Sequence, residues 1–279
     1  MSNVPKINIV KASGEIELYS RKKFRESLKR ASIGKLLIDE TQARVEGKLK
    51  EGISTEELYN LAKGFLAEKH IPAAAKYSLK KAIMELGPAG HLFERYFAAI
   101  LSEYGYQTQT NLILQGECVT HEIDVFAEKG DSRYFIEAKY HNSRGIKSDV
   151  KTALYTYARF LDIKANRGNK FNLKSWLVTN TKFTGQAIKY GECKDIKMTG
   201  WRYPKGESLE KLIENKGLYP ITVLPAINHY ARKQLSEADI YFAKELTNFS
   251  ASELIKKFDI HNDIASNIEK EAKEFINSL

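Results

Sequence analysis

The segment from His121 to His141 constrains the fold of this chain more than any other stretch. Apolar and polar residues alternate on both sides of a Lys-Gly-Asp-Ser turn, a pattern that predicts a β-hairpin. Because side chains alternate between the two faces of a strand, Asp124 points to one face and Ile123 and Val125 share the other. The hairpin therefore predicts one apolar face and one face that carries charge.

Pairing of the two strands brings three charged side chains together, with Asp124 on the first strand and Glu137 and Lys139 on the second. Two neighbouring carboxylates repel each other unless a cation joins them, and hard cations such as Mg²⁺ prefer carboxylate oxygens. A lysine beside the metal helps to orient or deprotonate a water, which gives metal-assisted hydrolysis of a phosphodiester. The alternative is an ordinary surface ion pair. The apolar frame of both strands favours central strands, where unpaired charges are costly.

Asp124 followed by Glu-Ala-Lys at 137–139 resembles the PD-(D/E)xK signature of restriction-endonuclease-like nucleases, especially the Mrr-like branch. The helix expected upstream of the hairpin is similar to the first helix of that family, which often contributes a glutamate near the metal. Glu94 holds that position. The resemblance implies that Asp124, Glu137, Lys139 and Glu94 are catalytic, and that Asp124 and Glu137 bind Mg²⁺.

Residues 1–86 predict an α+β module, in which a small hairpin precedes several helices. Ser20 is an expected N-cap, and Ser54 begins a Ser-Thr-Glu-Glu capping signal. The expected elements are strands at 7–10 and 15–19 and helices at 21–31, 39–49, 55–69 and 72–86.

Four stretches of this module, at residues 10–11, 14–24, 27–31 and 74–81, are similar in order to the ATP-cone, a nucleotide-sensing domain of ribonucleotide reductases and their repressors. The resemblance implies an allosteric effector, ATP or dATP. The residues it assigns to nucleotide binding are Lys11, Gly14, Lys22, Lys23 and Lys81. The family's phosphate-binding arginine after the lysine is replaced by Ala12, and the other lysines are candidate substitutes. A cone kept for dimerisation or docking is the alternative.

Residues 87–218 predict an α/β core with the element order αβββαβαβ, typical of a mixed sheet flanked by helices. Two glycines and a proline at 87–90 mark its boundary with the first module. Helix 148–165 is expected to bury the face that carries Val150, Leu154, Tyr157 and Leu161. The remaining expected elements are strands at 107–114, 174–180 and 196–201 and a helix at 184–191.

Residues 219–279 predict a helical C-terminal region. The expected helices are at 226–235, 237–246, 251–258 and 262–277, with Ser236, Ser250 and Asn262 as caps. Such helices offer backbone amides to DNA phosphates, or pack on the core or on a second subunit.

Polar and basic residues accompany the presumed cleft. Each of them could contact the DNA backbone. The alternatives are a capping turn for residues 179–182, a strand end in solvent for His121 and His141, and a solvated loop for the basic residues. These basic residues are Arg144, Lys147 and Lys151.

The 44 basic and 35 acidic residues leave a net charge of +9, which favours a polyanionic partner. The two cysteines, Cys118 and Cys193, suggest neither a disulfide framework nor a structural zinc site. Signal-peptide and bilayer-spanning runs are lacking, so a cytoplasmic protein with no membrane partner is expected. The sequence also lacks a GxxxxGK[ST] phosphate loop.

The leading hypothesis is a Mg²⁺-dependent DNA endonuclease, a homo-oligomer whose ATP-cone senses a nucleotide. A non-catalytic, nucleotide-responsive DNA-binding regulator or assembly subunit is the alternative, although a binding module needs no complete set of Asp124, Glu137 and Lys139.

Overall fold

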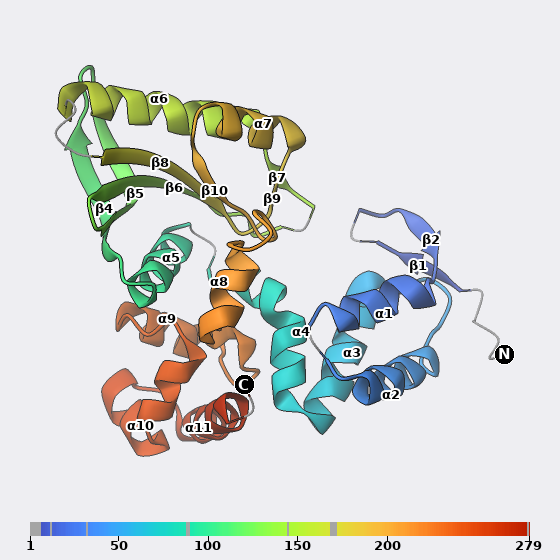
Figure 1. Cartoon of the computed structure of the whole chain (residues 1–279). Coiled ribbons are helices and arrows are strands. Elements are labelled where there is room, and N and C mark those ends of the chain that lie inside the picture. Colours follow the sequence, from blue (N-terminus) through green and yellow to red (C-terminus); the bar gives the residue numbers. More distant parts are fainter. Residues whose placement is uncertain are drawn as a thin grey trace. The chain divides into compact units, whose positions relative to one another are not determined.

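The structure is a computed structural model that describes residues 7–11, 13–31, 33–87, 90–143, 145–167, 172–277 and 279 (Figure 1). The chain divides into two compact units. The first contains Met1–Lys80, Val223–Gln234 and Glu245–Leu279, and the second contains Lys81–Thr222 and Leu235–Lys244. The division into domains 1–86, 87–218 and 219–279 remains a prediction.

A three-stranded sheet lies in the first unit, in the order β2-β1-β3. Strand β1 runs antiparallel to β2 and parallel to β3. The turn between β1 and β2 contains Gly14 at φ 82°, a left-handed conformation that glycine adopts without a steric penalty. The strands are β1 (Asn8–Val10), β2 (Ile16–Leu18) and β3 (Ile53–Ser54).

Four helices follow the hairpin strands in the N-terminal part, which confirms its α+β class. The side chain of Ser20 accepts a hydrogen bond from the Lys23 N–H, and Ser54 forms a capping box with Glu57. The second helix begins at Lys35, four residues before the predicted start, because Gly34 takes the N-cap position. The helices are α1 (Arg21–Lys29), α2 (Lys35–Glu46), α3 (Thr55–Lys69) and α4 (Ile71–Met84).

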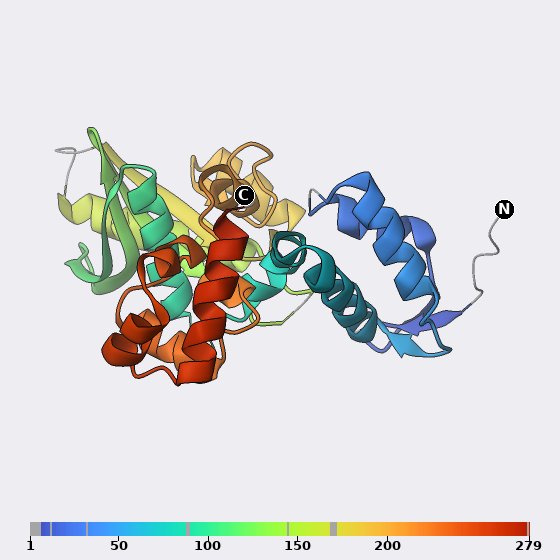
Figure 2. The ribbon, with the colours of Figure 1, turned by 90° about the horizontal axis from the view of Figure 1, so that it is seen from below.

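The C-terminal region is helical, as predicted, although one expected helix is wrong. Residues 237–246 form no α-helix, because Asp239 has φ 59° and a 3₁₀ turn follows, so Ser236 is not its cap. Ser250 does form a capping box, whereas His261 rather than Asn262 precedes the last helix. Helices α10 and α11 pack against each other (Figure 2). The elements are η1 (Ile221–Val223), α9 (His229–Glu237), η2 (Ala243–Asn248), α10 (Ala251–Phe258) and α11 (Asn262–Ile276).

A five-stranded mixed sheet forms the second unit, in the order β10-β8-β6-β5-β4, which confirms the predicted α/β core. Strands β4, β5 and β6 form an antiparallel meander, and β6, β8 and β10 run parallel. The strands are β4 (Gln107–Gln115), β5 (Thr120–Lys129), β6 (Ser132–Lys139), β8 (Asn172–Thr179) and β10 (Lys197–Thr199).

Helices cover both faces of this sheet (Figure 1). Helices α6 and α7 lie on one face, and α5 and α8 lie on the other. Strands β7 and β9 form a separate, two-stranded parallel sheet. Neither this sheet nor helix α8 was predicted. The elements are α5 (His91–Glu103), β7 (Lys147–Ser148), α6 (Val150–Arg167), β9 (Lys182–Phe183), α7 (Gly185–Cys193) and α8 (Leu209–Lys216).

Helix α6 buries a face that only partly matches the predicted one, because Tyr157 packs against the core whereas two other predicted residues do not. Leu154 and Leu161 are 45% and 46% exposed, whereas Ala153, Phe160 and Ile163 are buried. Apolar residues stand on more than one side of this helix, so periodicity allows two faces and packing on the sheet selects one. The buried face is the one that bears on the candidate site.

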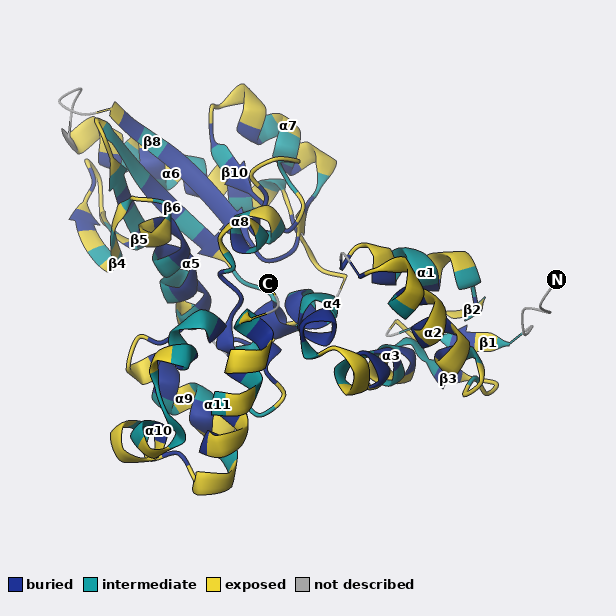
Figure 3. Ribbon diagram, turned by 60° about the horizontal axis from the view of Figure 1, so that its bottom comes forward, coloured by how far each residue is buried: buried dark blue, intermediate teal, exposed yellow. Residues whose placement is uncertain are grey.

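The centre of the second unit is aromatic. Trp176 on β8 is 2% exposed and meets Phe97 of α5 edge to face, with ring centroids 5.5 Å apart. Its indole N–H donates to the Thr199 hydroxyl. Strand β8 is buried along most of its length, as expected of a central parallel strand (Figure 3).

Candidate active site

The β5–β6 hairpin places Asp124 next to the end of β6. Regular pairing of the two strands runs from Lys129–Ser132 to Val125–Ile136. Beyond it, the Asp124 carboxylate accepts a hydrogen bond from the Ala138 N–H at 2.7 Å. The side chain thus replaces a backbone acceptor and fixes its own position at the sheet.

Side-chain alternation along β5 is interrupted at Asp124. Ile123 and Phe126 belong to one apolar cluster although they are three positions apart in the strand, so the predicted sharing of a face by Ile123 and Val125 is wrong. On β4, Asn111 stands between the residues paired with Val125 and Ile123 and has φ 55°. Asparagine tolerates this left-handed conformation, and the irregular backbone lies level with the break in alternation at Asp124.

Four carboxylates act on one another at this place. Burial and then Asp124 raise the pKa of Glu137 to about 7. Burial, followed by the charges of Asp124, Glu122 and Glu137, raises the pKa of Glu94 to about 7. Burial also raises the pKa of Asp124, although the hydrogen bond from the Ala138 N–H acts in the opposite direction and lowers it. The chemistry of this donor set fits a hard divalent cation, which would relieve the repulsion.

Two basic side chains complete the charged group. Lys139 at the end of β6 is exposed, and its charge acts on both Asp124 and Glu137. Arg159 of α6 forms an ion pair with Glu137 in which both side chains are nearly buried. Sequence reasoning missed Arg159, since the face of α6 expected to turn inward was only partly right. Arg159 lies three residues after buried Thr156, so it is placed near the sheet only once the buried face of α6 is known.

The predicted catalytic residues lie in one region of the second unit, although the carboxylates of Glu94, Asp124 and Glu137 are not all within ligand distance of one another. Within the described ranges, one group of three candidate ligand side chains lies within mutual ligand distance, and it is Glu117, Cys118 and Asp162. That group is occupied by protein contacts. The Asp162 carboxylate accepts from the Cys118 and Val119 N–H groups and bonds the ring of His121 at 2.7 Å.

These contacts lower the pKa of Asp162 to about 2, with the Cys118 N–H as the largest cause and His121 next. They hold the β4–β5 turn against α6. The interpretation of His121 as a strand end in solvent is wrong, because its side chain is 13% exposed and paired.

His141 is likewise tied into the protein rather than free in solvent. Its backbone N–H donates to the side chain of buried Asn180, whose amide donates back to the His141 carbonyl. Its ring bonds the Ser148 hydroxyl, which donates to Thr179. Burial and Lys139 lower the pKa of His141. These bonds fix the segment that follows Lys139 to the end of β8.

The predicted DNA-contacting lysines lie beyond the carboxyl ends of β6 and β8. Lys147 of β7 pairs in register with Lys182 of β9, and both are exposed, as is Lys151. Arg144 lies outside the described residues. Parallel strands end at one edge of a sheet, so these charges and Lys139 follow strand ends at that edge.

The predicted nucleotide-binding residues lie on the hairpin and helices of the first unit, except Lys81, which belongs to the second. Lys11 contacts Glu15 and Glu17, and these carboxylates, Glu17 foremost, raise its pKa. Lys23 also contacts Glu17. Lys22 lies with Arg21 and Lys29 along a surface hollow of α1 and α2. Lys81 pairs with Glu85, and Ala12 lies outside the described residues.

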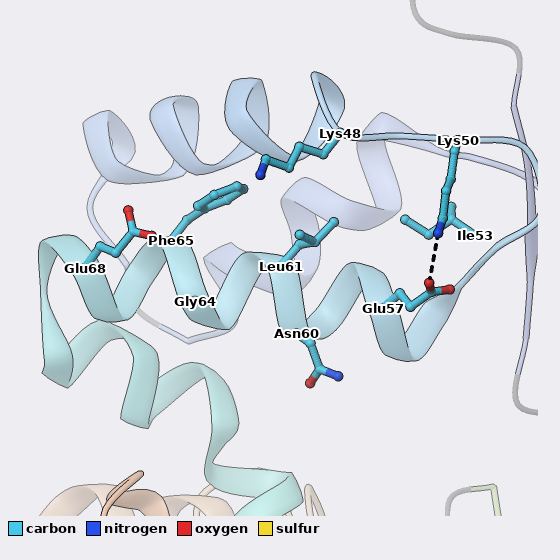
Figure 4. A pocket seen from close by; sticks show the side chains of 9 residues that line it. All are labelled: Lys48, Lys50, Ile53, Glu57, Asn60, Leu61, Gly64, Phe65 and Glu68. Atoms are coloured by element: carbon cyan, nitrogen blue, oxygen red, sulfur yellow. Dashed lines mark ion pairs between the residues drawn. The ribbon is translucent and has the colours of Figure 1, made fainter.

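A separate pocket of about 530 Å³ opens beside α3 (Figure 4). Its lining includes Phe65, Leu61 and Lys48, and Lys50 is paired with Glu57 at its edge. None of the predicted nucleotide-binding residues lines it, so it is distinct from the site implied by the cone resemblance.

Three family models match the chain in succession. An ATP cone domain matches residues 7–83, a restriction endonuclease domain matches 88–199, and an AF1548-like C-terminal domain matches 219–276. These matches and the fold define the class of protein, a restriction-endonuclease-type domain preceded by an ATP cone domain.

An uncharacterised protein of Archaeoglobus fulgidus is 41% identical over 179 residues, which are 64% of this chain and 99% of that protein. A solved structure, the crystal structure of the protein of unknown function AF1548, is 39% identical with a TM-score of 0.60. The match covers 68% of this chain and all of the other. The chain belongs to the AF1548-like family and carries an ATP cone in front of its restriction endonuclease domain.

None of the helices in the described part of the chain combines the length and apolar character that a bilayer crossing requires.

Proposed function

We propose that this protein is a Mg²⁺-dependent DNA endonuclease whose activity responds to a nucleotide bound by the ATP cone. The observation that carries the proposal is the juxtaposition of Asp124, Glu137 and Glu94 beside Lys139 in a restriction endonuclease domain. Carboxylates that are partly buried without full compensation are costly, and such clusters are frequent at functional sites.

In this proposal Asp124 and Glu137 hold the divalent cation, and Glu94 supports it from α5. When bound, the cation supplies an acidic water and neutralises charge on the phosphate. Lys139 orients or deprotonates the attacking water from the exposed end of β6. The Ala138 N–H keeps Asp124 in place throughout.

DNA is the substrate that the charge distribution favours. The net charge of +9 attracts a polyanion, and Lys147, Lys151 and Lys182 supply exposed cations beyond the ends of the strands that carry the site. Contacts of such lysines with phosphates give affinity without reading sequence.

Nucleotide regulation rests on the ATP cone at residues 7–83. Lys11 and Lys23 converge on Glu17, so a nucleotide phosphate would exchange an intramolecular partner for a more highly charged one. An effector acts at a distance only if it binds two states unequally, such as two oligomeric arrangements.

One observation favours a second candidate, a DNA-binding regulator without catalysis. Arg159 neutralises Glu137, as a cation would in a site that has no need of metal. Incubation of plasmid and linear DNA with the purified chain, with and without Mg²⁺ and across ATP, dATP and ADP, separates the two. Metal-dependent cleavage supports the endonuclease, whereas binding without cleavage under every condition contradicts it.

A further inference from the structure

Arg159 is the basic residue of the charged group that the proposed endonuclease mechanism does not use. Its side chain is 13% exposed and reaches from α6 to the Glu137 carboxylate, itself 16% exposed. Together with Ile123, Thr156 and Phe160 it lines a small recess between α6 and the sheet. The guanidinium also lies 5.2 Å from the centre of the Tyr155 ring.

Arg159 balances a local excess of negative charge. Glu94, Glu122, Asp124 and Glu137 act on one another, and the cations whose charge acts on Asp124 and Glu137 are Lys139 and Arg159. Lys139 is exposed and screened by solvent, so the nearly buried guanidinium carries more of the compensation.

We propose that Arg159 is a built-in counter-cation, which holds Glu137 when the site contains no metal and competes with the divalent cation for that carboxylate. The inference rests on the proposed function insofar as Glu137 is a metal ligand. Arg159 is then a positioning residue, which keeps Glu137 ordered before metal binds and releases it on binding.

The competition follows from electrostatics. A carboxylate that makes an ion pair with a guanidinium must give up that contact, or share it, before it coordinates a second cation. Removal of the guanidinium therefore raises the affinity for metal, because one positive charge leaves and a ligand is freed. The same removal destabilises the metal-free protein, because the repelling carboxylates lose their buried partner.

A purely structural role predicts a different pattern. If Arg159 only fastens α6 to the sheet, its loss lowers thermal stability with and without metal alike, and it leaves the affinity for metal unchanged or weaker. The sign of the change in affinity therefore distinguishes the two roles.

The test compares full-length wild type with Arg159→Gln and Arg159→Lys after removal of metal by a chelator. Arg202→Gln is the matched control. Arg202 makes a bidentate ion pair with Glu210 in the same unit, and neither residue belongs to the charged group of the candidate site. Calorimetric titration with Mg²⁺ and with Ca²⁺ at alkaline pH, where protons compete least for Glu137, gives affinity, and thermal unfolding with and without each ion at the same pH gives stability.

Arg159→Gln is expected to bind the ions on the order of tenfold more tightly, to unfold at a lower temperature without metal, and to gain more from metal than wild type. Arg159→Lys, which keeps the charge but not the planar fork, is expected between the two. Arg202→Gln should leave ion affinity unchanged.

Unchanged or weaker ion binding by Arg159→Gln overturns the inference; if that variant does not fold, the same outcome in Arg159→Lys overturns it. Asp124→Ala separates this failure from failure of the proposed function. If wild type binds ions and Asp124→Ala does not, but neither Arg159 variant binds them more tightly, the proposed metal site is supported and only the counter-cation role of Arg159 is rejected. If wild type binds no ion, both the proposed metal site and the counter-cation role of Arg159 are rejected.

Discussion

The Asp124 carboxylate accepts the Ala138 N–H across the β5–β6 hairpin at 2.7 Å, at the level where the regular pairing of the two strands ends. The proposed metal ligand is therefore also a structural acceptor for a strand backbone. Substitutions of Asp124 can distinguish its role as a metal ligand from its role as a hydrogen-bond acceptor.

Asp124→Asn keeps an oxygen that accepts the Ala138 N–H, whereas Asp124→Ala leaves that N–H without its partner. We expect Asp124→Ala to be less stable than Asp124→Asn by about 1–2 kcal/mol, as for other unsatisfied donors. Denaturant unfolding of the metal-free variants measures the difference. Equal stability of the two would mean that the hydrogen bond contributes little.

Lys139→Ala should lose the chemical step more than DNA affinity. One exposed lysine adds a modest, salt-screened contact with phosphate, whereas orienting a nucleophile acts directly on the barrier. Single-turnover cleavage and equilibrium DNA binding, measured at one salt concentration, separate the two. Lys182→Ala, at an exposed position beyond the strand ends, is the control and should change binding only. A binding loss with no loss of rate would place Lys139 among the DNA contacts.

The raised pKa values of Glu137 and Glu94, both about 7, predict a pH dependence. Metal binding requires ionised carboxylates, so ion affinity should rise between pH 6 and pH 8. Stability of the metal-free protein should change in the opposite sense. The folded state holds protons more tightly than the unfolded state, whose glutamates titrate near 4.5, so stability falls as pH rises from about 4.5 through about 7.

Unfolding measured across that pH range, with a chelator and then with Mg²⁺, tests both signs. Glu94→Gln removes one of the two groups and should make the metal-free stability less dependent on pH. Metal-free stability that increases over the same interval would contradict the assignment of the raised pKa values.

Substitution of Lys11 should weaken nucleotide binding to the full-length chain. The lysine side chain stands on the hairpin with Glu15 and Glu17, where a phosphate would compete with those carboxylates. We expect Lys11→Ala to lower ATP affinity by about tenfold, and ATP to change wild-type cleavage by roughly 5–150-fold, the usual range of allosteric coupling. Calorimetry with ATP, dATP and ADP decides the first point. Absence of binding at millimolar nucleotide would leave the cone without a sensing role.

Local signals in the sequence were sufficient where the chain's own neighbours determine structure. The capping box of Ser54 and Glu57 predicted α3 with its observed bounds, and the turn at 129–132 predicted the central hairpin. Helix α8 was missed although Ser208 caps it and Gly217 ends it in a left-handed conformation. Its eight residues form a short periodic segment, which single-sequence patterns resolve poorly.

Tertiary packing determined the features that the sequence did not predict. The face of α6 depends on which side chains fit the sheet, and Arg159 becomes visible only once Ile163 and Phe160 are known to point inward. The irregular backbone at Asn111, which stands between the residues paired with Val125 and Ile123, has no motif in the sequence either. Asp124, Glu137 and Lys139 were nevertheless found, because a hairpin makes them neighbours through local sequence alone.

If Asp124 and Glu137 carry metal-dependent DNA cleavage, substitution of either one should abolish single-turnover cleavage with Mg²⁺. The comparison needs wild type, Asp124→Asn and Glu137→Gln, purified identically and shown to be folded, with a chelator control for each. We expect cleavage by wild type that the chelator abolishes, and rates at least about 100-fold lower in both variants, since each loses a ligand charge. Cleavage by either folded variant at the wild-type rate, or by wild type in the chelator, would contradict this expectation.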